Sequence, residues 1–432
     1  MAIASTNPAT GELIQSFDAL TEEQIDEKLA TAAAAFRSYR TTTFAERAEW
    51  LRRAADILDA EADALGRLAT LEMGKTLASA VAEVGKCAKG CRWYAEHTEA
   101  VLADQPHPFD GAKVFTRYEP LGPVLAIMPW NFPYWQVFRF AAPALMTGNV
   151  GLLKHASNVP QCALAIEAII EDPRVRAVTL TGSEAAGRAV GATAGRTIKP
   201  SVLELGGSDA FIVMPSADLD TAVAKAVHSR TLNNGQSCVN AKRFIVHEEI
   251  ADEFVSRMVA RLESLKIGDP LDSSTQMGPL ANPDAVEEID RQVQETISAG
   301  ARLHTGGKPL GGPGSFYPPT LLTDIPDGSP GHDEELFGPV ALVWRARDVD
   351  DAIRIANDSD LGLGGSAWTT DPAEQERFTT EVDTGMIYIN HFTESTPEVP
   401  FGGTKNSGYG RELAEYGPKS FVNAKTVWIA DD

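Results

Sequence analysis

Basic residues, cysteines and long apolar runs are all scarce in this chain of 432 residues. Lys and Arg number 38 against 60 Asp and Glu, which gives a formal net charge of −22 at pH 7. Because nucleic acids and anionic membranes attract cations, this balance argues against both as partners. No apolar run is long enough to cross a bilayer, and no basic segment followed by an apolar one, typical of a signal peptide, stands at the start. We therefore expect a cytoplasmic protein.

The four cysteines are too few for a disulfide framework in a chain of this size. Cys87 and Cys91 stand four positions apart in a helical pattern, so they share a helix face, but no histidine stands nearby to complete a zinc site. Buried helix cysteines are the favoured interpretation, and the sequence predicts no metal site. The length and the 43% hydrophobic content fit a globular protein of two or three domains.

Hydrophobic periodicity changes along the chain. We expect a helix after Thr21, which forms a capping box with Gln24, and a long helical region at 44–102. Strand-like alternation follows at 113–130. From there short apolar runs take turns with helical patterns, which predicts an α/β fold of parallel sheets with helices on both faces. The final stretch, 421–430, alternates like an edge strand.

Cys238 stands in the polar stretch LNNGQSCVNAKR, where Asn and Gly allow the backbone to turn tightly. A cysteine on such a turn lies near peptide N–H groups, which favour the reactive thiolate. The alternative is a small buried side chain without reactivity. None of the eight histidines stands in a recognisable cysteine-protease signature, so a nucleophilic Cys238 needs another activator.

Three further stretches offer polar groups next to predicted strands. Glu204 ends the apolar run before two glycines in LELGG, and serves there either as a general base or in a surface salt bridge. Asn131, between the prolines of MPWNFP, either donates to an oxyanion or binds its own backbone. Gly182 and Ser183 lie between a strand and a helix start, a place that attracts phosphate.

These stretches occur in one order with EELFGPV and PFGGTKNSGYGRE further on. As a set they resemble the NAD(P)-dependent aldehyde dehydrogenases, from about residue 7 to residue 429. Within that family the chain is most similar to the bacterial succinate-semialdehyde dehydrogenases. The resemblance implies a Rossmann-like cofactor domain, an α/β catalytic domain and a β-ribbon for oligomerisation. The expected boundaries are 1–103 with 122–206, then 207–406, and 104–121 with 407–432, respectively.

The resemblance implies a role for each matching residue. Cys238 would attack the aldehyde, Asn131 would hold the oxyanion, and Glu204 would activate water to release the acid. Glu412, in the GRE of the last motif, matches a glutamate that assists proton movement, with a surface helix cap as the alternative. The ribbon implies a homodimer or homotetramer.

The same resemblance implies a cofactor site. The residues implied to bind the cofactor are Trp130, Lys154, Ser157, Gly182, Ser183, Glu335 and Phe337. Many members that prefer NAD carry glutamate at the position of Ser157. Because serine removes a charge that would repel a 2′-phosphate, we expect NADP to be preferred, with NAD as the alternative cofactor.

The implied substrate is succinate semialdehyde, a small aldehyde that carries a carboxylate. Arg139 matches the arginine that pairs with that carboxylate, since a guanidinium grips a carboxylate in two places, and Ser395 falls near a second contact. The alternative for Arg139 is a structural ion pair. Functional alternatives are a broad-specificity enzyme or one for another ω-carboxy aldehyde, and a thiol esterase that needs no nucleotide.

One departure from the family is large. The stretch between Lys154 and Gly182 is shorter than family members need for a helix, a strand and another helix. We expect the cofactor domain to be shortened between 165 and 175 and to lack an inner strand of its sheet. A catalytically impaired or inactive variant is therefore a further alternative.

Overall fold

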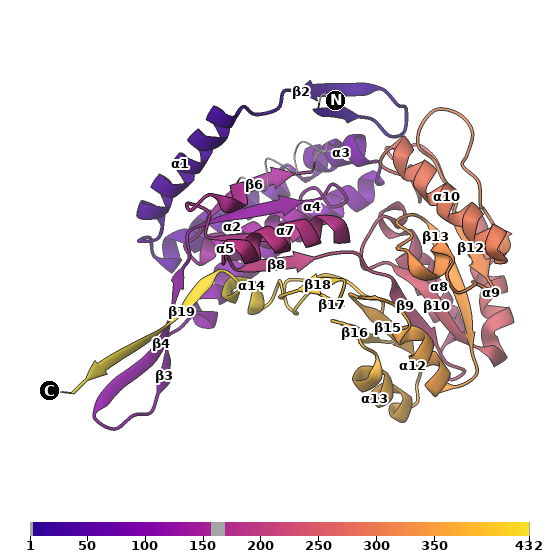
Figure 1. The fold of residues 1–432 in the computed structure, drawn as a ribbon. Coiled ribbons are helices and arrows are strands. Elements are labelled where there is room, and N and C mark those ends of the chain that lie inside the picture. Colours follow the sequence, from indigo (N-terminus) through magenta and orange to yellow (C-terminus); the bar gives the residue numbers. More distant parts are fainter. Residues whose placement is uncertain (1–2, 157–168, 432) are drawn as a thin grey trace.

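The computed structural model describes residues 3–156 and 169–431. Two large sheets lie in separate parts of the molecule, and a narrow ribbon of strands projects away from the body (Figure 1). Both sheets consist mainly of parallel strands, which confirms the α/β fold that the alternating pattern predicts. No helix within these ranges is long and apolar enough to cross a membrane.

The first hundred residues are mostly helical. Thr21 Oγ1 accepts a hydrogen bond from Gln24 N at 3.2 Å, and Gln24 Oε1 accepts one from Thr21 N at 2.9 Å, so the predicted capping box is present. The helical region at 44–102 contains three helices, and Gly74, with φ of +83°, ends the second of them. The elements are β1 (Ile3–Thr6), β2 (Leu13–Phe17), α1 (Glu22–Tyr39), α2 (Phe44–Ala60), α3 (Ala62–Met73) and α4 (Leu77–Val101).

A five-stranded sheet forms the first half of the α/β fold. Its strand order is β18-β8-β7-β5-β6, and only β18 runs antiparallel. Helices α1 and α7 pack on one face, and α5 packs on the other. The bounds are β5 (Pro123–Met128), α5 (Trp135–Met146), β6 (Val150–His155), β7 (Ala177–Thr181), α7 (Glu184–Arg196), β8 (Ser201–Glu204) and β18 (Gly408–Tyr409).

The shortened segment leaves no gap inside this sheet. Strand β5 pairs directly with β6 on one side and with β7 on the other. In the described part of the chain β6 is therefore the last strand of the sheet, and the expectation of a missing inner strand stays a prediction. On β6 the side chain of Leu153 is 53% exposed, so the edge of the sheet carries apolar surface.

A seven-stranded sheet forms the second half, with the order β11-β12-β13-β10-β9-β15-β16. Helices α8 and α9 cover one face, and α12 and α13 cover the other. The strands are β9 (Asp209–Val213), β10 (Ala241–His247), β11 (Arg302–Thr305), β12 (Thr320–Thr323), β13 (Val340–Ala346), β15 (Gly365–Trp368) and β16 (Ile387–Ile389). The helices are α8 (Leu219–Thr231), α9 (Glu248–Glu263), α10 (Pro283–Ala299), α12 (Val349–Asn357) and α13 (Pro372–Glu381).

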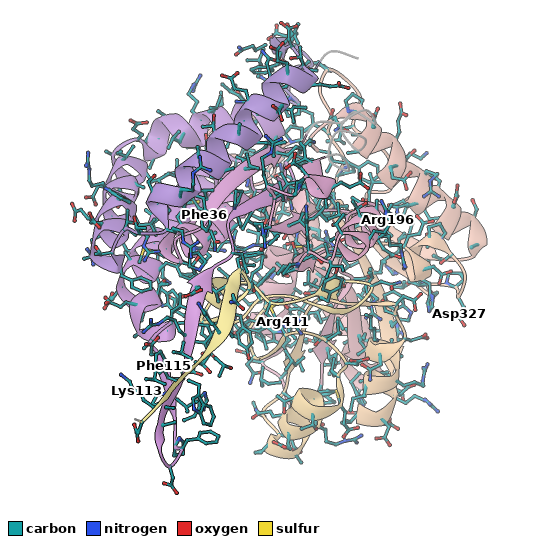
Figure 2. The ribbon with its side chains drawn as sticks, turned by 60° about the vertical axis from the view of Figure 1, so that its left-hand side comes forward. Phe36, Lys113, Phe115, Arg196, Asp327 and Arg411 are labelled. Atoms are coloured by element: carbon teal, nitrogen blue, oxygen red, sulfur yellow. The ribbon has the colours of Figure 1, made fainter. Side chains whose placement is uncertain are left out.

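Three antiparallel strands form the ribbon: β3 (Gln105–His107), β4 (Ala112–Pro120) and β19 (Val422–Ala430). Strand β19 pairs with β4 along its full length, so the last residues of the chain lie beside a segment three hundred positions earlier. Figure 2 shows Lys113 and Phe115 on the ribbon, outside the body of the molecule. Residues 408–409 belong instead to the five-stranded sheet as β18.

Candidate active site

Cys238 lies in the loop between α8 and β10, after the short turn η1 (Leu232–Gly235). Asn233 and Asn234 have left-handed backbone angles, with φ of +55° and +56°, which asparagine tolerates better than most residues. The Asn234 side chain holds the turn by donating to two backbone carbonyl oxygens, each at 2.9 Å. The tight turn that the sequence predicts is present, and Cys238 is half-buried beyond it.

Gly235 brings this loop against the loop that contains EELFGPV. Its φ is +83°, and a Cβ atom at this position would lie 2.4 Å from the backbone carbon of Gly338. No side chain fits between the two backbones. The contact therefore links Cys238 mechanically to the loop that carries Glu335 and Phe337.

Asn131 lies beside the same loop. Its Nδ2 donates to the carbonyl oxygen of Gln236 at 3.2 Å, and its own carbonyl oxygen accepts from Asn233 Nδ2 at 2.8 Å. The residue is 4% exposed. The Asn131 carboxamide is thus held against Gln236, which stands two residues before Cys238. A side chain that donates to an oxyanion has to be fixed in this way.

Helix α5 starts directly after the MPWNFP stretch, and Glu83 of α4 holds its first turn. One carboxylate oxygen of Glu83 accepts from the backbone N–H groups of Tyr134 and Trp135, both at 2.9 Å. The other lies 2.5 Å from Lys75 Nζ in a fully buried ion pair. A negative charge at a helix N-terminus is favourable, so this pair orients the segment between Asn131 and α5.

Arg139, on α5, lies between the two glutamates of the expected site. Its guanidinium is 3.2 Å from Glu204 and 2.8 Å from Glu412, and it donates to Thr181 Oγ1 at 2.9 Å. The three charged side chains are buried, with Arg139 only 2% exposed. Burial opposes the charge of Arg139, but the carboxylates of Glu412 and Glu204 outweigh it and raise the pKa of Arg139. This geometry favours the ion pair, one of the two interpretations of Arg139.

The thiol of Cys238 faces a negative environment. Burial, and then the charge and hydrogen bond of Glu204, raise the pKa of Cys238 well above its usual value. Arg139 and Lys242 oppose that rise. A raised pKa favours the protonated thiol, so attack on a carbonyl would need a base, and Glu204 is a carboxylate within hydrogen-bonding distance of the thiol.

Glu335 and Phe337, two of the residues expected to bind the cofactor, lie near Lys242, which also contacts Cys238. Glu335 Oε1 accepts from Gly207 N at 3.1 Å and lies 2.9 Å from Lys242 Nζ, while the same ammonium donates to the carbonyl oxygen of Cys238 at 2.9 Å. Lys242 therefore ties Glu335 to the backbone of the nucleophile. The rings of Trp130 and Phe337 meet edge to face with centroids 5.9 Å apart.

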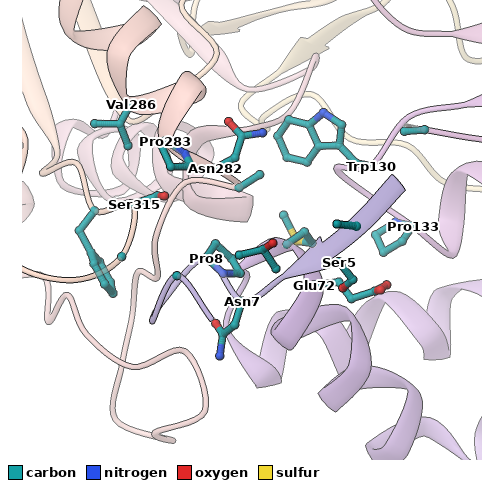
Figure 3. Close-up of a pocket in the computed structure, with 18 of the residues that line it drawn as sticks. Ser5, Asn7, Pro8, Glu72, Trp130, Pro133, Asn282, Pro283, Val286 and Ser315 are labelled. Atoms are coloured by element: carbon teal, nitrogen blue, oxygen red, sulfur yellow. The ribbon is translucent and has the colours of Figure 1, made fainter. Parts of the chain in front are cut away.

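A cavity of about 800 Å³ opens beside Trp130. Figure 3 shows its lining, which includes Ser5 and Asn7 of the N-terminal segment and Asn282 and Pro283 at the start of α10. His155 and Ala156, at the carboxyl end of β6, also line it. Open α/β sheets bind ligands at such strand ends, and the volume is within the range of small-molecule sites, so the cavity fits part of a nucleotide cofactor.

The remaining expected cofactor residues are more scattered. Lys154 lies in β6, directly before His155, which lines the cavity. Ser183 caps α7, and its Oγ accepts from Ala186 N at 3.3 Å, so the predicted helix start after Gly182 is present. Ser157 lies outside the described residues.

Ser395 comes from the loop after β16 and lies over α5. Its Oγ accepts from the indole Nε1 of Trp135 at 3.0 Å. The sequence did not point to Trp135, nor to Lys86, whose ammonium lies 4.5 Å from the centre of the same indole. It also missed Lys242 and Asn233. Their side chains donate to the backbone carbonyl oxygens of Cys238 and Asn131, and no sequence pattern identifies such contacts.

The model of the aldehyde dehydrogenase family matches the chain in two pieces, residues 1–170 and 164–427. The chain belongs to the aldehyde dehydrogenase family. The two pieces of the match meet at 164–170, where the sequence predicts that this aldehyde dehydrogenase is shortened.

Two curated relatives align with nearly all of this aldehyde dehydrogenase. Succinate-semialdehyde dehydrogenase (NADP+) 1 of Mycobacterium tuberculosis is 55% identical over 459 positions and is covered completely, as is this chain. The enzyme of the same name from Mycobacterium ulcerans is 56% identical and covers 99% of the chain. Because the chain has 432 residues, at least 27 positions of the M. tuberculosis relative have no counterpart in it.

Two solved structures share the fold. The succinic semialdehyde dehydrogenase from Streptococcus pyogenes, in complex with NADP+, has a TM-score of 0.95, is 34% identical, and aligns over 99% of this chain and 100% of its own. The succinate-semialdehyde dehydrogenase from Burkholderia pseudomallei also has a TM-score of 0.95 and 34% identity, over 100% and 95% of the two chains. The expected aldehyde dehydrogenase fold is confirmed.

Proposed function

We propose that this aldehyde dehydrogenase oxidises succinate semialdehyde to succinate and reduces NADP. The observation that carries the chemistry is the grouping of Cys238, Glu204 and Asn131 between the two large sheets. The substrate is supported by the full-length relatives, which are named for it.

In this proposal Cys238 is the nucleophile and Glu204 is the base. Glu204 accepts the thiol proton, and the sulfur forms a bond to the aldehyde carbon. The Asn131 amide and the backbone N–H of Cys238 donate to the oxyanion. Trp130, Glu335 and Phe337 would hold NADP, which would supply the acceptor for the hydride that leaves the substrate carbon. Glu204 then releases that proton to solvent and accepts another from a water molecule, whose oxygen attacks the acyl thioester on Cys238. The carbon–sulfur bond breaks, the Cys238 thiolate takes up a proton, and succinate is released.

Glu412 and Arg139 act on that base. Arg139 offsets two negative charges that burial would otherwise disfavour, since its guanidinium contacts Glu204 and Glu412 together. We assign Glu412 to the hydrogen-bonding arrangement of this site rather than to a surface helix cap, because it is 6% exposed.

The cofactor side of the proposal uses Trp130, Phe337, Glu335 and Lys154, with Gly182 and Ser183 at the start of α7. Support comes from the cavity of about 800 Å³ beside Trp130 and from the NADP+ in the names of the relatives. We propose that NADP is preferred over NAD because Ser157, unlike a glutamate, does not repel the 2′-phosphate. We also propose a cytoplasmic homo-oligomer joined through the ribbon.

Steady-state kinetics with NADP tests the substrate. We expect kcat/KM for succinate semialdehyde to exceed that for butanal, the uncharged aldehyde of equal length, by about tenfold or more, as for one hydrogen bond to a charged group. Cys238→Ala should abolish turnover of both, while Cys91→Ala, a change of the same size on α4, should not. Equal rates for the two aldehydes would favour a broad-specificity enzyme instead.

The shortened cofactor domain supports one alternative, an enzyme with weak cofactor binding. A variant that carries the extra positions of the M. tuberculosis relative separates the two cases. If both forms bind NADP with the same affinity in a titration of protein fluorescence, the shortening is harmless. A gain of about 1.4 kcal/mol or more, which is a tenfold lower Kd, would identify the natural chain as impaired.

A further inference from the structure

The cation expected to hold the substrate carboxylate is already occupied. Arg139 is 2% exposed and contacts both Glu204 and Glu412. A third carboxylate at this guanidinium would set three negative charges against one positive charge in a buried site. Breaking either existing pair would leave a buried glutamate without its cation, which is costly. A second cation near the reaction centre would avoid both problems.

Lys86 is such a cation. It lies on α4, three residues after Glu83, and its Nζ is 4.5 Å from the centre of the Trp135 ring. The side chain is partly exposed, and within the described ranges no acidic group lies within 4 Å of it. Among the residues that the structure describes, its ammonium group therefore forms no ion pair.

Trp135 connects this ammonium to the reaction centre. Its backbone N–H is held by Glu83 and its indole N–H by Ser395, so the ring that faces Lys86 is fixed at both ends. Trp135 also belongs to the cluster of apolar side chains against which Cys238 packs. The charge of Arg139 acts on both groups, since it lowers the pKa of Lys86 and opposes the rise in the pKa of Cys238.

We infer that Lys86 determines the substrate specificity of this enzyme by binding the carboxylate at the far end of the aldehyde, with Trp135 as the wall between that carboxylate and Cys238. The inference rests on the proposed function. An ammonium above an indole ring is a favourable site in itself, and a carboxylate that reaches it gains a charge-assisted hydrogen bond. Ser395 lies on the same indole and offers a hydroxyl to the same end of the substrate.

The kinetics of Lys86→Met with succinate semialdehyde and butanal test this inference. We expect KM for succinate semialdehyde to rise about 10- to 100-fold, the loss of one hydrogen bond between charged groups, with kcat/KM for butanal unchanged. Lys86→Arg should restore most of the lost affinity. Lys89→Met is the matched control: Lys89 lies on the same helix but is 58% exposed and pairs with Glu398 at 2.6 Å, and we expect no change.

Two contrary outcomes differ from one another. If the unmodified enzyme prefers succinate semialdehyde and Lys86→Met keeps that preference, Lys86 has no part in recognition and the proposed function stands. If the unmodified enzyme turns over both aldehydes equally, the proposed function and this inference both fall. Inhibition by succinate gives an independent measure, because its inhibition constant should rise in Lys86→Met to the same extent as KM.

Discussion

Arg139 shows how one side chain acquires a role from the partners around it. The sequence pattern assigns it either to the substrate or to an ion pair, and the folded chain brings two glutamates to it from β8 and from the C-terminal segment. Burial raises the pKa of Glu412, while the charge of Arg139 opposes that rise. The positive charge of Arg139 therefore allows the carboxylates of Glu204 and Glu412 to lie close together in a buried site.

Arg139→Met should destabilise the protein by about 3–5 kcal/mol, because it leaves buried carboxylates without their cation. Without the guanidinium the pKa of Glu412 rises further above its value in the unfolded chain. A carboxyl whose pKa is raised by folding destabilises the protein at pH values above its pKa in the unfolded chain. The loss of unfolding free energy in Arg139→Met should therefore grow as pH rises from about 5 to 8. Urea denaturation at both pH values measures it. A variant that raises KM for succinate semialdehyde without any loss of stability would instead support the substrate role.

Lys86 should make the preference for a charged aldehyde depend on pH. Burial and the charge of Arg139 lower the pKa of Lys86 to about 8, against the opposing charges of Glu394, Cys87 and Glu83. The ammonium is present below that pH and is lost above it. The ratio of kcat/KM for succinate semialdehyde to that for butanal should therefore fall as pH rises through about 8.

The titration of Cys238 affects kcat/KM for both aldehydes alike, so it cancels in the ratio of the two values. In Lys86→Arg the decline should vanish, since a guanidinium keeps its charge throughout this range. A decline that is equally steep in the arginine variant would have to come from another group.

At the scale of elements, the carboxylate of Glu83 on α4 joins that helix to the first turn of α5. Lys75 is completely buried, and burial lowers its pKa while Glu83 opposes that change. Because Glu83 also accepts from the first N–H groups of α5, one carboxylate orients both the lysine and the helix.

Glu83→Ala should cost about 3–5 kcal/mol of unfolding free energy, as removal of one partner of a buried ion pair does. Glu96→Ala, an exposed position on the same helix, should stay within about 0.5 kcal/mol of the unmodified protein. Urea denaturation midpoints compare the two. Equal midpoints for both variants would mean that α4 and α5 are held together by apolar packing alone.

Elements with local signals could be predicted from the sequence. The start of α1 follows from Thr21 and Gln24, and the start of α7 follows from Ser183, because a helix cap is made within four residues. The order of strands in a sheet has no such signal, because contacts between distant segments of the chain decide it.

The same limit applies to the site. Cys238, Glu204 and Asn131 follow from motifs, whereas the partners of Arg139 and the position of Lys86 depend on contacts between distant segments.

At the scale of the whole molecule, the ribbon projects from the body and carries exposed aromatic side chains (Figure 1). The rings of Phe109 and Trp428 pack with centroids 4.7 Å apart, yet each side chain is more than half exposed. A ribbon of this kind, projecting from the body, leaves apolar surface for a partner to cover.

Trp428→Glu should therefore weaken the proposed homo-oligomer, since it sets a charge into an apolar contact. Analytical ultracentrifugation should show a smaller species at the same concentration. Thr426→Glu, on the same strand, introduces the same charge without the loss of the ring and serves as the comparison. An unchanged sedimentation coefficient for Trp428→Glu would locate the interface elsewhere.

The contact of Gly235 with Gly338 has a consequence for protein engineering. Because the nucleophile loop and the loop with Glu335 touch backbone to backbone, their conformations cannot be sampled separately. A directed-evolution library of the nucleophile loop should therefore keep Gly235, because any other residue would push its Cβ atom into the backbone of Gly338. Paired diversification, with both glycines retained, is the search that this architecture permits.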